Sequence, residues 1–192
     1  MDLRQRTRRA VQADIGEAAV TLFLEHGFEA VTMDQIAAAA GISRRSLFRY
    51  FAGKEDIVLG DLIEAGRAAR EVLEAQPPQD PPWTALKAAF KALADAPDGR
   101  PERAMRVARM IYDTPALHAA HLEKQLRWQA LLVPDVERRL GITGGEGRDP
   151  RARAIVAAAL ICLDLAVQEW SRLGGHGDVE KLYDDAVAAV RG

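Results

Sequence analysis

The sequence predicts an all-α protein with about nine helices. Its long periodic segments carry apolar residues at helical spacing, and none alternates apolar and polar residues as a strand does. Glycine and proline, which end helices, stand between these segments. The chain has no internal repeat, so a repeat architecture is excluded.

Short loops separate the first three predicted helices. The apolar positions that define the first are Val11, Ile15, Ala18, Ala19, Leu22 and Phe23. Gly27 ends this helix, because glycine readily takes the left-handed conformation of a helix terminus. Thr32 is the predicted N-cap of the second helix, 33–40, and Ser43 that of the third, which reaches residue 51.

Six further helices follow. They are predicted at 54–75, from Trp83 to Leu93, between breaks at 96–101 and 113–115, and at 115–140, 151–173 and 178–190. Pro134 should kink or divide the helix at 115–140, since proline lacks the backbone donor. The glycine-rich loop GITGGEG lacks both the lysine and the preceding strand of a phosphate-binding loop, so it is interpreted as a helix connector.

Length and composition limit the classes of protein to consider. At 192 residues, 48% of them hydrophobic, the chain forms one large domain or two small ones. A single cysteine, Cys162, excludes a disulfide framework and fits a reducing compartment. The charged N-terminus shows no secretory signal, and the longest apolar run, 154–163, is about half of a membrane span. We therefore expect a cytoplasmic protein with no membrane partner.

Positive charge is concentrated in two segments, although the net charge is −2. Residues 1–10 contain four arginines against one aspartate, a local charge of +3. Residues 41–54 contain three arginines and one lysine without an acid, a local charge of +4. If the fold brings the two segments together, they form a surface suited to a polyanion.

The segment GISRRSLFRYF, 41–51, combines these arginines with an amphipathic helix. At about 100° per residue, one side within roughly 140° carries Arg44, Arg45, Phe48 and Arg49. Leu47 and Phe51 lie on the other side and can anchor to a core. Arginine in the first turn of a helix is unfavourable beside the positive end of the helix dipole. An anion such as phosphate would offset this unfavourable charge, so the segment is interpreted as an anion-binding helix. The alternative interpretation is a solvated helix whose arginines serve solubility.

Residues 33–52 have the pattern of a helix-turn-helix. Ala37 permits close crossing of the two helices, Gly41 forms the turn, and Ile42 and Leu47 pack back onto the first helix. The second helix then presents its polar side to a DNA major groove.

Residues 11–60 resemble the TetR family of transcription regulators. The resemblance rests on the run HGFEAVTMDQIAAAAGISRRSLFRYFAGKEDIV after an amphipathic helix. It implies a three-helix DNA-binding domain at 1–53 and a ligand-binding and dimerisation bundle at 54–192. The later part, with RWQALL and a late alanine-rich helix, resembles the acyl-CoA-binding subgroup.

The resemblance also implies a set of DNA-binding residues. They are Thr32, Arg44, Arg45, Ser46, Arg49, Tyr50 and Lys54. Thr32 would contact phosphate, Arg45 would face base edges, and Lys54 would hold the DNA backbone. Position 45 is often small in the family and position 48 is often tyrosine. Here Arg45 adds a guanine-reading group, and Phe48 lacks a phosphate-bonding hydroxyl.

The remaining helices are expected to bind an effector and to form a homodimer. The helix at 151–173 is apolar nearly all round, which favours dimerisation through it and through 178–190; the alternative is the central helix of a monomeric bundle. Nine residues are candidate pocket lining, with ordinary core as the alternative for each. They are Trp83, Phe90, Met105, Arg109, Met110, His121, Trp128, Asp164 and Trp170.

The predicted function is a transcription regulator, a repressor released from its DNA operator by a small apolar, acyl-CoA-like effector. The helix at 54–75 is expected to be the only continuous element joining the two domains. Alternatives are an activator with the same fold, or a helical-bundle enzyme or ligand carrier. No catalytic constellation is visible, and we expect no cofactor and no metal, since His118 and His121 lack a third ligand.

Overall fold

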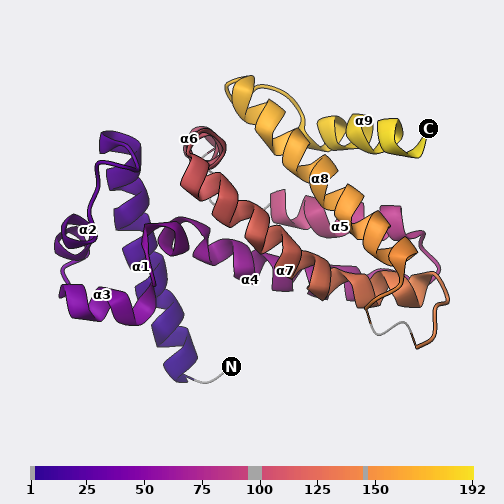
Figure 1. Cartoon of the computed structure of the whole chain (residues 1–192), viewed down its shortest axis with the longest axis horizontal. Helices are drawn as coiled ribbons and strands as arrows, with labels where there is room; N and C mark the ends of the chain where they lie inside the picture. Colours follow the sequence, from indigo (N-terminus) through magenta and orange to yellow (C-terminus); the bar gives the residue numbers. More distant parts are fainter. Residues whose placement is uncertain (1–2, 95–100, 145–146) are drawn as a thin grey trace. The chain divides into compact units, whose positions relative to one another are not determined.

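The structure, a computed structural model, describes residues 3–94, 101–144 and 147–192. Within these ranges it contains nine α-helices and no strand, as the sequence predicts (Figure 1). The predicted break at 96–101 lies, except for its last residue, outside the described residues.

The chain divides into two compact units. One comprises Met1–Asp61 with Met110–Ala120, and the other comprises Leu62–Arg109 with His121–Gly192. We call them the N-terminal and the C-terminal unit. The division falls inside α4 (Lys54–Ala75), and also inside α6 (Pro101–Asp113) and α7 (Pro115–Arg139). The expectation that one helix alone joins the two parts is therefore wrong, because three helices contribute to both units.

The N-terminal unit contains α1 (Leu3–His26), α2 (Met33–Ala39) and α3 (Arg44–Tyr50). Its helices meet through apolar side chains that are less than a tenth exposed: Ile15, Ala19, Val20, Phe23, Phe28, Val31, Ile36, Ala37, Leu47 and Phe51. The rings of Phe23 and Phe28 lie 5.0 Å apart across the end of α1.

Helix α1 begins eight residues before Val11, the first residue of its apolar pattern. The arginine-rich segment at the N-terminus is thus helical from Leu3 onward. The helix ends where the sequence predicts, with Gly27 at a φ of 87°. This extension matters because it places the first basic segment on the same rigid element as the core residue Ile15.

The C-terminal unit adds α5 (Pro82–Ala94), α8 (Pro150–Arg172) and α9 (Val179–Arg191). Its core combines residues of five helices: Ala69, Leu73, Ala85, Leu86, Ala89, Phe90, Trp128, Leu132, Val133, Val136, Ala152, Val156, Ala159, Leu160, Cys162, Ala166 and Tyr183. Asp149 and Asp178 cap α8 and α9 by accepting hydrogen bonds from backbone N–H groups of the first turns.

Helix α7 continues through Pro134 to Arg139, so this proline does not divide it. Helix α8 is long and apolar enough to cross a membrane by length and composition, with a mean hydropathy of 1.6. Its inner face, however, carries six residues of the core of the C-terminal unit. That composition is what a central helix of a bundle requires.

A close contact fixes α4 against α7 within the C-terminal unit. The indole N–H of Trp128 donates to the backbone carbonyl of Leu62 at 2.8 Å. This approach requires a glycine at Gly66, because a Cβ there would lie 2.5 Å from Trp128 Nε1. The ring therefore occupies the space of a missing side chain on α4.

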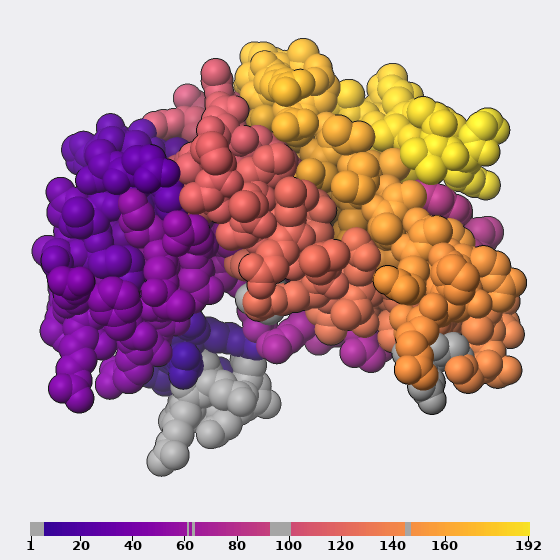
Figure 2. Space-filling model, viewed as in Figure 1, coloured from indigo at the N-terminus to yellow at the C-terminus, as the bar shows by residue number. Residues whose placement is uncertain are grey.

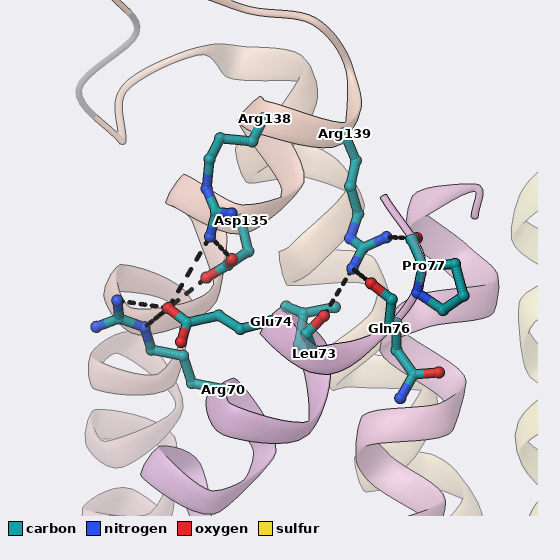
Figure 3. A network of polar contacts seen from close by, with 8 residues as sticks. All are labelled: Arg70, Leu73, Glu74, Gln76, Pro77, Asp135, Arg138 and Arg139. Atoms are coloured by element: carbon teal, nitrogen blue, oxygen red, sulfur yellow. Dashed lines mark hydrogen bonds and ion pairs between the residues drawn. The ribbon is translucent and has the colours of Figure 1, made fainter. Parts of the chain in front are cut away.

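A second contact holds the C-terminal end of α4. The guanidinium of Arg139 donates to the carbonyls of Leu73 at 2.6 Å, Gln76 at 3.1 Å and Pro77 at 2.6 Å (Figure 3). A cation at this end satisfies free carbonyls and complements the negative end of the helix dipole.

An ion-pair group lies beside this cap. Arg138 pairs with the buried Asp135 on α7, and Arg70 pairs with Glu74 at 2.7 Å on α4 (Figure 3). Arg70 also approaches Asp135 at 3.8 Å. Together with the Trp128 contact, these interactions fix α4 against α7 over the whole length of α4 that belongs to the C-terminal unit.

Candidate functional site

Helix α2 has a reciprocal cap. The hydroxyl of Thr32 accepts from the backbone N–H of Gln35 at 3.3 Å, and the Gln35 side chain accepts from the Thr32 N–H at 2.8 Å. The backbone N–H and the hydroxyl of Thr32 thus both form hydrogen bonds within the protein. Its exposed hydroxyl also lies 3.0 Å from Gln35 Oε1, so a contact with phosphate would compete with this bond.

The turn between α2 and α3 has the predicted geometry. Gly41 has a φ of 65°, a conformation that glycine adopts without strain. The N–H of Ile42 donates to the carbonyl of Ala37 at 3.0 Å. Ser43 caps α3, accepting from the N–H of Ser46 at 3.1 Å. Leu47 is fully buried, which anchors the inner face of α3 and leaves its arginines outside.

The three arginines of α3 are exposed, and they differ in their contacts. Arg44 donates to the carboxylate of Asp34 on α2 at 3.2 Å and lies 5.6 Å from the ring centre of Phe48. Arg45 has no hydrogen-bond or ion-pair partner in the described part of the chain. Arg44 is therefore already oriented by the protein, whereas Arg45 extends into solvent.

The two basic segments of the sequence meet in the N-terminal unit. Arg8 of α1 lies 5.9 Å from the ring centre of Tyr50, and Arg49 lies 5.3 Å from the same ring centre. The side chain of Gln12 donates to the Tyr50 carbonyl at 3.5 Å. One arginine of each basic segment thus lies against the same ring, where α1 approaches the end of α3.

Lys54 lies at the start of α4 and bonds to the segment after α1. Its ammonium donates to the carbonyls of Phe28 at 2.9 Å and Glu29 at 3.3 Å, and it lies 4.7 Å from the centre of the Phe28 ring. These contacts join the start of α4 to the loop after α1. The sequence does not reveal them, because the partners are backbone carbonyls rather than acidic side chains.

Comparison with known proteins decides the family. The profile described as "Bacterial regulatory proteins, tetR family" matches residues 15–60, and the profile "MftR C-terminal domain" matches residues 80–192. The transcriptional regulator TcmR of Streptomyces glaucescens is 31% identical over 98% of this chain and 86% of its own length. This chain belongs to the TetR family. It is a DNA-binding transcription regulator.

Other relatives agree with the TetR assignment. The mycofactocin biosynthesis transcriptional regulator MftR of Mycobacterium tuberculosis is 31% identical over 87% of this chain and 83% of its own length. FadR of Thermus thermophilus, solved with lauroyl-CoA, has a TM-score of 0.60 at 22% identity, with 92% of this chain and 91% of that chain covered. The SmeT–triclosan complex has a TM-score of 0.58 at 20% identity, covering 94% and 91%. The two structures show a common fold.

The nine residues predicted to line the effector pocket of this TetR-family chain do not form one group. Phe90 and Trp128 belong to the core, and Trp83 packs against it. Met105 and Trp170 both lie against Gly175, at the end of α8, whereas Arg109 is exposed. Met110 is part of the N-terminal unit.

Two of the nine, His121 and Asp164, form a close pair. His121 Nε2 lies 2.8 Å from Asp164 Oδ1, joining α7 to α8, and the two side chains are only 16% and 14% exposed. Gln125, one turn further along α7, lies 3.4 Å from the same nitrogen. His118 instead faces the ring of Tyr112 at 5.9 Å. The two histidines therefore serve different contacts.

A cavity of about 360 Å³ lies between α5, α8 and α9. It is lined by Lys87, Phe90, Lys91, Leu163, Gly177, Asp178, Val179, Glu180 and Tyr183. Of the predicted pocket residues only Phe90 lines it. The sequence indicates this cavity only through opposite charges at matching i, i+4 spacing, two lysines on α5 and two acids on α9.

Charge is balanced at this cavity. Hydrogen bonds from Lys91 and Lys87 lower the pKa of the Glu180 carboxyl. Hydrogen bonds to Asp184 and Glu180 raise the pKa of Lys87. Burial raises the pKa of Tyr183, whose hydroxyl has no hydrogen-bond partner in the described part of the chain. Lys87 and Glu180 therefore stay ionised at neutral pH, and the cavity lining contains two lysines and two acids.

The contacts of Lys54 predict a structural effect of its removal. We expect Lys54→Ala to destabilise the N-terminal unit by about 1–2 kcal/mol, because two charge-assisted hydrogen bonds to carbonyls are lost. Thermal unfolding followed by circular dichroism measures this. The control is Arg45→Ala, which removes an exposed cation that has no hydrogen-bond or ion-pair partner in the described part of the chain. It should leave the midpoint of thermal unfolding unchanged. If Lys54→Ala unfolds like the parent yet binds DNA weakly, Lys54 acts on phosphate instead.

Proposed function

We propose that this regulator is a repressor that binds its operator through α3 and leaves it when a small molecule binds the C-terminal unit. The main support is the surface of α3, with three exposed arginines above a fully buried Leu47. That arrangement places cations outward on a helix held rigidly from within. A major groove offers both phosphates and guanine edges to such a helix.

The seven residues assigned to DNA keep distinct proposed roles. Arg45 and Ser46 face base edges, with Arg45 donating two bonds to a guanine. Arg44 contacts the base edge or a nearby phosphate in the orientation that Asp34 gives it. The others, Thr32, Arg49, Tyr50 and Lys54, contact or position the DNA backbone.

The proposed homodimer forms through α8 and α9. Ile161 is 47% exposed and Leu165 is 51% exposed, and they lie one turn apart on α8. Much of α8 is visible on the face of the molecule shown in orange in Figure 2. Val190 of α9 is 56% exposed. These apolar side chains, facing away from the core, support burial against a second copy, and two copies would place two recognition helices on successive major grooves.

The proposed effector acts through α4. Its C-terminal part is held by Trp128 and Arg139 of α7, while its first turns belong to the N-terminal unit. A ligand that displaces Trp128, or the neighbouring His121 on the same helix, would move α4 and with it the recognition helix. Such a ligand must bind the DNA-free state more tightly, and DNA must weaken its binding in return.

Apolar molecules with a polar or anionic head are the proposed effectors. A structural neighbour of this chain is described with lauroyl-CoA and another with triclosan, which supports a panel containing both classes. The paired His121 and Asp164 offer a hydrogen-bonding group between α7 and α8. A cytoplasmic location follows from this role. An activator would show the opposite response, with the effector strengthening DNA binding.

Arg45 should determine base preference. We expect Arg45→Ala to lose about 1–3 kcal/mol of discrimination at one or two operator positions, because a bidentate guanine contact is removed. Binding to a library of operator variants, selected with the unmodified protein, measures it. An equal loss on every sequence would show that Arg45 contacts phosphate alone.

The α8 surface should be required for dimerisation. We expect Leu165→Arg to give a folded monomer, since the position is half exposed in one chain and a charge there is costly only when a partner covers it. Light scattering with circular dichroism measures both properties. Leu126→Arg, at a position 63% exposed on α7, is the control and should remain dimeric. A dimeric Leu165→Arg variant together with a monomeric Leu126→Arg variant would show that the interface lies on α7 instead.

The close contact at Gly66 should transmit the effector signal. We expect Gly66→Ala to push Trp128 away from α4, at a cost of about 1–3 kcal/mol, and to weaken operator binding without any effector. Gly60→Ala on the same helix is the control, because its Cβ would lie an ordinary 3.6 Å from Phe51.

Fluorescence anisotropy with labelled operator measures the effect of Gly66→Ala, followed by titration with acyl-CoAs, fatty acids and aromatic compounds. A compound that binds tightly and leaves the operator affinity of the parent unchanged would refute the coupling.

A further inference from the structure

Two guanidinium groups from different helices lie against one aromatic ring. Arg8 of α1 and Arg49 of α3 lie 5.9 Å and 5.3 Å from the centre of the Tyr50 ring. Gln12, one turn after Arg8, donates to the Tyr50 carbonyl at 3.5 Å and so holds this part of α1 at the end of α3. The arrangement is therefore built by packing between helices.

Like charges gathered in this way favour an anion between them. Both arginines are exposed, and no carboxylate is paired with either one in the described ranges. The ring face attracts each cation only weakly. A phosphodiester would bind both more strongly, since each arginine presents a planar set of donors that matches two phosphate oxygens.

We propose that Arg8, Tyr50 and Arg49 bind one phosphate of the DNA backbone. This inference rests on the proposed role of α3 as the recognition helix, and it adds α1 to the DNA contacts. Arg8 precedes the segment matched by the family profile, residues 15–60, so the family assignment does not supply it. A phosphate contact carries no base information, so this site sets the register and orientation of α3 in the groove.

The test compares two arginines of the same helix. Arg8→Ala and Arg6→Ala each remove one exposed positive charge, but position 6 lies about 160° away around α1. Dissociation constants are measured for operator and for non-specific duplex from low to moderate salt. We expect Arg8→Ala to weaken both duplexes about tenfold. It should also reduce the salt slope by about 0.9. Arg6→Ala should change either affinity less than threefold, and Arg8→Lys should restore part of the loss.

The double variant Arg8→Ala/Arg49→Ala tests whether one phosphate is shared. Residues that share a partner are coupled, so its loss should differ by more than about threefold from the product of the single losses. Equal losses of DNA affinity for Arg6→Ala and Arg8→Ala would show general electrostatic attraction by α1 rather than a defined phosphate site. A double loss equal to the product would mean separate phosphates. Either result overturns the proposal.

Non-specific duplex also separates this inference from the proposed function. The unmodified protein could bind no sequence preferentially while Arg8→Ala still weakens non-specific binding more than Arg6→Ala does. In that case the phosphate site stands, and only the proposed recognition of an operator sequence by α3 fails. If Arg8→Ala affects the operator alone, the arginine contacts a base and the phosphate site is wrong. Thermal unfolding of each variant shows that the differences arise in folded protein.

Discussion

The contact between Trp128 and the glycine gap at Gly66 is the constraint on which the arrangement of the C-terminal unit depends. The Trp128 ring bonds to a carbonyl of α4 beside a position where a Cβ would clash with it, so this approach requires glycine. Because interiors are close-packed, such a contact tolerates few intermediate positions. The contact therefore suits a helix that takes one of two discrete positions, with the Trp128 ring either in place or displaced.

The N-terminal unit follows the sequence closely because its determinants are local. Thr32, Ser43 and Gly41 act on residues within one or two turns of themselves, and each cap and the turn are present as predicted. The apolar positions of α1 bury the expected face. The start of α1 differs from the sequence pattern, since the charged residues before Val11 carry no apolar period and helical propensity alone extends the helix.

The contacts of the C-terminal unit were less predictable because they join residues far apart in the chain. Trp128 and Phe90 look equally suited to a pocket or a core. Both are buried in the core, and Phe90 also lines the cavity between α5, α8 and α9. Arg139 reads as a surface charge, yet its partners are backbone carbonyls of another helix. The pairing of His121 with Asp164 is equally hidden in the sequence, because it joins two different helices at positions 43 residues apart.

The ion pair between Arg44 and Asp34 has a consequence for how long the protein stays on DNA that lacks its operator. Non-specific affinity grows with every unopposed cation on the DNA-facing surface. An acid that stays bonded to Arg44 until a better partner arrives reduces that affinity on ordinary sequence. Lower affinity for ordinary sequence means a shorter stay on it, so we expect Asp34 to raise the rate at which the protein leaves DNA that lacks its operator.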